Sequence, residues 1–141
     1  MLKKFFLAVA FLALCLPLAA LAQTPAEAGS ALKAEAQVCT GIQERMPTGM
    51  AESFTPEVGQ VYLWCKITGS DGETTIKHVW YYQGNEMASV ELPVKSSSYR
   101  TWSAKKIMPQ WTGDWSVKVE DASGTVLKEI SFKIEPAAPT Q

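Results

Sequence analysis

The chain has 141 residues, thirteen basic and fourteen acidic side chains, and a formal net charge of -1. This length fits a single compact domain. The near balance of charges argues against a highly charged disordered protein and against a broadly basic nucleic-acid-binding protein. One His and three Cys are too few for a structural zinc site of the usual kind. We therefore expect no nucleic-acid partner, no metal and no cofactor.

Residues 1–22 are typical of a secretory signal peptide. Lys3 and Lys4 precede an uncharged, mostly apolar stretch at residues 5–22, which ends in the sequence Ala-Leu-Ala. Small residues at this spacing form a typical signal-peptidase cleavage site, so we expect cleavage before Gln23. The mature protein would then be periplasmic or secreted, without a transmembrane segment.

Two other fates of this segment stay open. Eighteen apolar residues could just span a bilayer as an uncleaved anchor, although Pro17 and the small residues near its end favour cleavage. Lipidation at Cys15 would require a small residue before the cysteine, and Leu14 is large.

Cleavage would leave two cysteines, Cys39 and Cys65. An even number of cysteines in an oxidising compartment predicts one disulfide, and two buried free thiols are the alternative. A catalytic thiol would need a nearby base, for which His78 is the sole histidine. No local signature supports that pairing.

Short segments of alternating apolar and polar residues predict strands rather than helices. Turn-forming residues separate them at short intervals. Pro93 indicates that its strand lies at a sheet edge. About seven strands are expected, at residues 61–67, 76–82, 90–94, 115–120 and 129–134 and near Leu32–Ile42 and Tyr99–Ile107.

Seven short strands in about 100 residues favour an immunoglobulin-like β-sandwich. A small closed barrel is the alternative. The predicted organisation is a signal peptide at 1–22, a flexible tether at 23–36, the sandwich at 37–135 and a disordered tail at 136–141. In true immunoglobulin domains a later cysteine closes the inter-sheet bridge, and this chain has none after Cys65.

Several segments carry a family resemblance. They are 42–47 followed by Phe54, 76–81 (IKHVWY), 99–105 (YRTWSAK), 113–117 (GDWSV) and 124–127 (GTVL). From Val38 to Ile134 the chain resembles the bacterial domain-of-unknown-function family 2914 (DUF2914). The resemblance implies an envelope location, an immunoglobulin-like fold and no assigned activity. The residues that it singles out are His78, Trp80, Tyr99, Arg100, Trp102, Ser103 and Lys105, with Tyr99 where the family pattern usually has Trp.

The aromatic residues divide by strand face. Trp80 and Trp115 share a face with aliphatic neighbours and are expected in the core. Tyr62 and Trp64 oppose the Val61-Leu63-Cys65 face, so we expect them to be exposed. Trp111 is not assigned to a face. Exposed Trp and Tyr side chains would suit an interface hot spot or stacking on sugar rings.

Alternation divides residues 99–106 into two faces. We expect Trp102 and Ala104 to point into the core, and Tyr99, Ser103 and Lys105 to point outward as candidate binding residues. The stem of Arg100 is expected to pack near the strand end, with its guanidinium at the surface. His78 and Trp80 are expected to hydrogen-bond to this strand or to stack on it.

Basic residues gather in one stretch of the chain. Between Glu91 and Asp114 there is no acidic residue, whereas four are basic: Lys95, Arg100, Lys105 and Lys106. This stretch is either an anion-binding face or a sheet edge that lysines protect against aggregation.

No catalytic signature accompanies these features. The sequence contains no nucleophile elbow, no metalloprotease helix and no phosphate-binding glycine loop. His78 is better explained as a hydrogen-bonded structural residue, and we expect no enzymatic activity. Two functions fit: a non-catalytic cell-envelope recognition module that binds a glycan, peptide or protein, or a structural accessory domain of a periplasmic or membrane-associated complex.

Overall fold

The structure is a computed structural model, which describes residues 31–137. Seven long strands account for most of this range, and each overlaps one of the predicted strands. They are β1 (Lys33–Cys39), β5 (Gln60–Thr68), β6 (Thr74–Tyr82), β7 (Asn85–Val94), β8 (Ser98–Lys106), β9 (Gly113–Glu120) and β10 (Val126–Ile134). The predicted all-β class is confirmed.

Shorter elements fill the connection between β1 and β5. They are β2 (Gly41–Gln43), β3 (Met46–Thr48), β4 (Ser53–Phe54) and the 3-10 turn η1 (Pro56–Val58). The alternation of polar and apolar residues did not predict them, because two or three residues are too few to show a period. Among residues 31–137, η1 is the sole helical turn.

The predicted boundaries lie partly outside the described residues. The signal peptide at 1–22, most of the tether at 23–36 and the end of the tail at 136–141 all fall there. Strand β1 begins at Lys33, so the last four residues of the predicted tether are in a strand.

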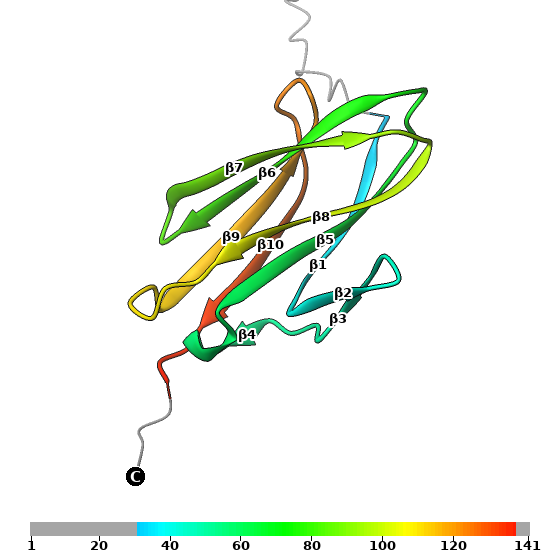
Figure 1. Cartoon of the computed structure of the whole chain (residues 1–141). Coiled ribbons are helices and arrows are strands. Elements are labelled where there is room, and N and C mark those ends of the chain that lie inside the picture. Colours follow the sequence, from blue (N-terminus) through cyan, green and yellow to red (C-terminus); the bar gives the residue numbers. More distant parts are fainter. Residues whose placement is uncertain (1–30, 138–141) are drawn as a thin grey trace, which may run out of the picture.

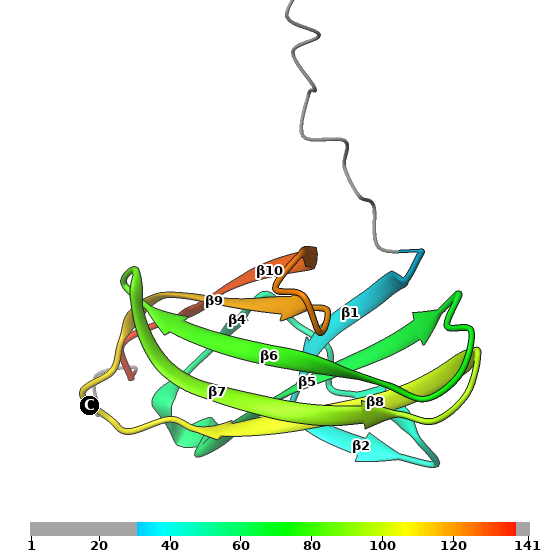
Figure 2. The same ribbon diagram turned by 90° about the horizontal axis from the view of Figure 1, so that it is seen from above.

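The long strands form two sheets that lie as two layers (Figures 1 and 2). One sheet has the order β1-β5-β8, and the other has the order β4-β10-β9-β6-β7. All pairings are antiparallel except the short parallel pairing of β4 with β10. Strand β7 lies at an edge of the larger sheet, as Pro93 predicted.

One hydrophobic core fills the space between the layers. Both sheets contribute alternate residues to it: Val61, Leu63 and Ile67 come from β5, and Ile76, Val117 and Ile134 from the larger sheet. Trp80 and Trp115 are 0% and 2% exposed, so their predicted core positions are confirmed. Phe132 stacks against the Trp115 ring and meets the Trp80 ring edge to face.

The strands β2 and β3 form a hairpin on the outer side of the smaller sheet (Figure 2). Its two-residue turn is Glu44-Arg45, and both residues have positive φ, 50° and 63°. A turn of this kind normally contains Asn or Gly, because larger side chains are strained there. The hairpin therefore holds an arginine in a backbone conformation that arginine disfavours.

The predicted disulfide is wrong, because Cys39 and Cys65 are free and buried. In the β1–β5 register Cys39 lies opposite Tyr62 and Cys65 lies opposite Ala36. Cys65 lies three positions after Tyr62, so it is displaced by about 10 Å along the strand and its side chain points to the other face. The two thiols are thus too far apart to bond, and the alternative of two buried thiols holds.

Candidate functional site

The two faces of β8 are the reverse of those predicted. Thr101 and Ser103 are buried, 9% and 7% exposed, whereas Trp102 and Ala104 are half-buried on the outer face. The prediction placed the largest apolar side chain inward. In the structure the large Trp80 crosses from the opposite sheet, and the small Ser103 leaves room for it. Tyr99 and Lys105, at the two ends of the inner face, are half-buried.

A buried polar network joins the two sheets at this point. His78 on β6 is fully buried, and its Nδ1 lies 2.6 Å from the Ser103 Oγ. The Trp80 Nε1 donates to the same Oγ at 3.3 Å. The His78 Nε2 lies 3.2 Å from the Cys65 Sγ on β5. The expected hydrogen bonds from His78 and Trp80 to β8 are confirmed.

Two arrangements of the protons satisfy this network. In one, the Ser103 hydroxyl donates to the His78 Nδ1, and the ring proton on Nε2 points at the Cys65 sulfur. In the other, the His78 Nδ1–H donates to the Ser103 Oγ and the Cys65 thiol donates to Nε2. Every buried polar side-chain atom of residues 31–137 has a partner.

Burial keeps both titratable members of the network neutral. Desolvation raises the pKa of Cys65 to about 12 and lowers the pKa of His78 to about 4. A nucleophilic cysteine requires the thiolate and access to substrate. The thiol here is protonated, and both side chains are 0% exposed, so the network supplies hydrogen bonds between the sheets.

A second group of residues lies at the β8 edge of the smaller sheet. The Arg45 guanidinium lies 5.5 Å from the centre of the Tyr99 ring and 5.7 Å from that of the Trp102 ring. One of its nitrogens donates to the main-chain oxygen of Arg100 at 2.7 Å. We call Arg45, Tyr99 and Trp102 the arginine–aromatic cluster. It presents one exposed cation and two half-buried rings.

The hairpin also explains why Trp64 is not exposed. This residue lies on the predicted outer face, opposite Trp102, but it is only 5% exposed. Its Nε1 donates to the main-chain oxygen of Arg45 at 2.8 Å. The predicted exposure of Trp64 is therefore wrong, because the hairpin covers it. The neighbouring Tyr62 is half-buried.

A second cation–aromatic pair lies at the other end of β8. The Lys105 ammonium is 4.9 Å from the centre of the Trp111 ring. The Trp111 ring is half-buried and meets the Trp115 ring edge to face. The main-chain oxygen of Trp111 accepts a hydrogen bond from the Trp115 Nε1. The Arg100 side chain is exposed, as expected.

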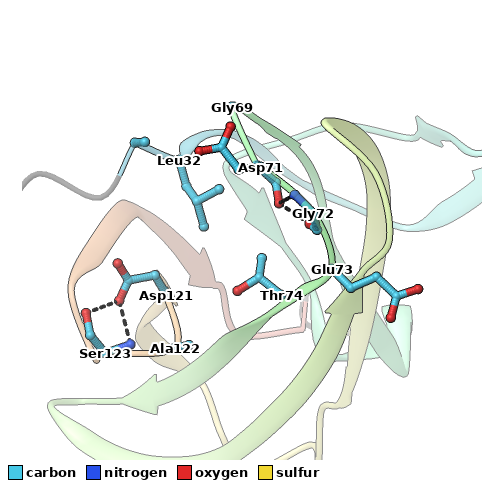
Figure 3. A pocket seen from close by; sticks show the side chains of 11 residues that line it. Leu32, Gly69, Asp71, Gly72, Glu73, Thr74, Asp121, Ala122 and Ser123 are labelled. Atoms are coloured by element: carbon cyan, nitrogen blue, oxygen red, sulfur yellow. Dashed lines mark hydrogen bonds between the residues drawn. The ribbon is translucent and has the colours of Figure 1, made fainter.

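A pocket of about 440 Å³ lies at the end of the molecule where the β5–β6 and β9–β10 loops meet (Figure 3). Its acidic residues are Asp71, Glu73 and Asp121, and the Glu73 side chain points away from the cavity. The Asp121 carboxylate accepts hydrogen bonds from Ser123 and Thr125 and so holds its own turn. The pocket includes none of the sequence-predicted site residues.

Within residues 31–137, no group of three or more His, Cys, Asp and Glu side chains could hold a metal ion. The same part of the chain contains no helix of the length and hydrophobicity needed to cross a membrane.

Arg45 was not predicted from the sequence, Trp64 was wrongly predicted to be exposed, and Trp102 and Ser103 were placed on the wrong faces of β8. The signal for Arg45 was weak, because Glu44-Arg45 is not a typical hairpin turn sequence. His78 offered a clearer signal: a histidine on an apolar face needs a hydrogen-bond partner from the opposite sheet. Ser103 was a suitable candidate for that partner.

Comparison with known proteins finds a family model that matches part of the chain. Residues 73–134, which contain β6 to β10, match the model described as "Protein of unknown function (DUF2914)". The family resemblance predicted from the sequence is confirmed over this segment. The match contains His78, Trp80 and the whole of β8, whereas Arg45, Trp64 and Cys65 precede it.

No curated protein matches the chain. Among solved structures it is similar to a beta-glucosidase from Listeria innocua in complex with glucose, with 11% identity and a TM-score of 0.48. A mutant of that enzyme in complex with laminaribiose gives 10% identity and a TM-score of 0.45. Each alignment covers 77% of this chain but only 17% of the glucosidase. These TM-scores do not establish a shared fold.

Proposed function

We propose that this domain is a non-catalytic recognition module of the cell envelope. The arginine–aromatic cluster carries the proposal. Arg45 is held at its main chain by Trp64 and at its side chain by Arg100, Tyr99 and Trp102. An exposed arginine fixed in this way, beside two partly accessible rings, has the composition of an interface hot spot.

The order of the strands supports an immunoglobulin-like sandwich as the scaffold of this module. One sheet holds β1, β5 and β8, and β6, β7, β9 and β10 lie in the other. In such domains the chain passes repeatedly between two sheets that share one core. Binding residues can then be held by one rigid strand, as Tyr99 and Trp102 are by β8.

The N-terminal sequence supports delivery to the envelope. A basic start, an apolar stretch and small residues before Gln23 are those of a cleaved signal peptide. Mass spectrometry of the expressed protein should find an N-terminus at or near Gln23. Recovery of an intact Met1, or of a lipid-modified Cys15, would contradict this part of the proposal.

The binding role is tested by capture from envelope extract. Tagged wild-type protein is compared with Arg45→Ala and Trp102→Ala. Tyr81→Ala is the matched control, because Lys118 lies 5.0 Å from the Tyr81 ring in an equivalent pair on the other sheet. We expect both cluster variants to lose a captured component that the control retains. Equal capture by all four proteins would overturn the proposal.

A structural accessory domain is the second candidate. It is favoured by the packing of Trp64 under the hairpin and of Trp111 against Trp115, since both rings are used within the domain. Under this alternative, the cluster variants would change the stability of the domain without changing what it captures.

A further inference from the structure

The strand β8 has one open edge. It lies at the end of the β1-β5-β8 sheet and pairs with β5 alone. In an antiparallel strand, the N–H and C=O of one residue point to the same side and those of the next residue to the other. The side to which each residue of β8 points can therefore be assigned from a few hydrogen bonds.

Odd-numbered residues face β5 and even-numbered residues face the open edge. Just beyond the ends of β8, the Ser97 oxygen and the Ile107 N–H bond to Gly69 and Gly59, which flank β5. The Arg100 oxygen instead accepts from the Arg45 side chain. The main-chain groups of Trp102 and Ala104 consequently point outward, where no strand within residues 31–137 pairs with them.

The charges along this edge are mainly positive. Arg100, Lys105 and Lys106 belong to β8, and Arg45 reaches the edge from the hairpin. Lys66 on β5 lies directly opposite Arg100, although like charges at opposed positions destabilise a sheet. The nearby acids are Glu35, opposite Lys66 on β1, and Glu44, beside Arg45 in the turn.

This charge pattern distinguishes between possible occupants of the edge. Lysines on an edge strand discourage pairing with another copy of the same edge. Two β8 edges would bring like charges together, whereas an acidic strand would be attracted. The Arg45 guanidinium has five N–H donors, and one of them is used on the Arg100 oxygen. Its other donors can bind a carboxylate.

We propose that the β8 edge from Trp102 to Lys106 binds an extended acidic peptide by strand addition, with Arg45 taking a carboxylate at one end. The inference rests on the proposed recognition function and specifies the partner's chemistry. Main-chain hydrogen bonds to Trp102 and Ala104 would supply part of the affinity, and the basic side chains would select acidic sequences.

The test uses a fluorescent eight-residue peptide of alternating Val and Glu, titrated into the full mature protein and followed by anisotropy. Two comparison peptides replace Glu by Lys or carry N-methyl groups on alternate residues, which remove their main-chain donors. We expect saturable binding of the acidic peptide. Both comparison peptides should bind about tenfold more weakly or not at all, since each loses one source of affinity.

Two variants test the edge itself. Ala104→Pro removes one outward N–H without touching the β5–β8 ladder, and Ala104→Ser keeps that N–H as the matched control. The Pro variant should weaken binding about tenfold through the lost hydrogen bond, and the Ser variant should bind like wild type. Should Ala104→Pro fail to fold, the N-methylated peptide on wild-type protein decides the question.

Three results would overturn strand addition: no binding of the acidic peptide, equal binding of the N-methylated peptide, or equal binding of inorganic polyphosphate with Ala104→Pro unaffected. The last result would indicate a general anion site. None of these results contradicts the recognition function if Trp102→Ala still abolishes capture from envelope extract. If Trp102→Ala captures as much as wild type, both the recognition function and strand addition are contradicted.

Discussion

On the inner face of β8, Ser103 lies between His78 and Trp80 and is almost inaccessible to solvent. One residue earlier, on the outer face, Trp102 lies half-buried beside the Arg45 guanidinium. The inner residue satisfies buried polar atoms that would otherwise destabilise the fold. The outer residue belongs to a group that stays partly open to solvent and includes an exposed charge. Under the proposed recognition function, these adjacent residues have different roles: Ser103 stabilises the fold and Trp102 contributes to binding.

The comparison predicts that loss of a core ring has the largest effect on stability. Trp80 is 0% exposed and contacts the Phe132 ring edge to face. Trp80→Ala should lower the free energy of unfolding by about 3–5 kcal/mol, as removal of large aromatic side chains from cores does. Urea denaturation followed by far-UV circular dichroism measures the change. A loss below about 1 kcal/mol would mean that this region is not tightly packed.

Removal of the Ser103 hydroxyl should have the next largest effect. Ser103→Ala leaves the His78 Nδ1 and the Trp80 Nε1 without their shared partner in a buried site. Two unpaired polar groups should cost about 2–4 kcal/mol. Ser103→Thr retains the hydroxyl and should restore part of the loss in the same denaturation experiment. Equal loss in both variants would point to packing and not to the hydrogen bonds.

The pH dependence of stability should reveal His78. Its pKa is about 4 in the folded protein and near 6.5 when unfolded, so the unfolded chain binds a proton first as the pH falls. This contribution is fully present above pH 6.5 and is lost as the pH falls toward 4. The loss between pH 7 and pH 4.5 should be about 2 kcal/mol. In His78→Asn the loss of stability between these two pH values should be smaller by that amount. An unchanged loss would contradict a role for His78 in the pH dependence.

The sequence predicted the long strands well because each alternates apolar and polar residues. The core positions of Trp80 and Trp115 followed from the same pattern, and the edge position of β7 followed from Pro93, which cannot donate to a strand ladder. The faces of β8 could not be predicted in this way, since Trp102 outranks Ser103 in hydrophobicity. Their placement depends on two tertiary contacts, a buried His78 that needs a hydroxyl and a hairpin that covers the outer face.

The disulfide prediction failed for a related reason. Cysteine number and export indicate whether a bond is possible, but strand register decides whether two thiols meet. Cys39 and Cys65 lie on neighbouring strands with an odd offset in register, which places them on opposite faces. Cys65 instead lies beside His78, a contact between β5 and β6 that no local signature in the sequence indicated.

The most direct test measures three quantities in Trp102→Ala and Ser103→Ala: the free energy of unfolding, the melting temperature and capture from envelope extract. Trp102→Ala should lose capture while its free energy of unfolding falls by only about 1 kcal/mol, because the ring is half-buried and its contact with Arg45 is partly exposed. Ser103→Ala should melt at a clearly lower temperature, yet below that temperature it should still capture the partner. Full capture by folded Trp102→Ala, or loss of capture by folded Ser103→Ala, would contradict the division of roles between the two faces of β8.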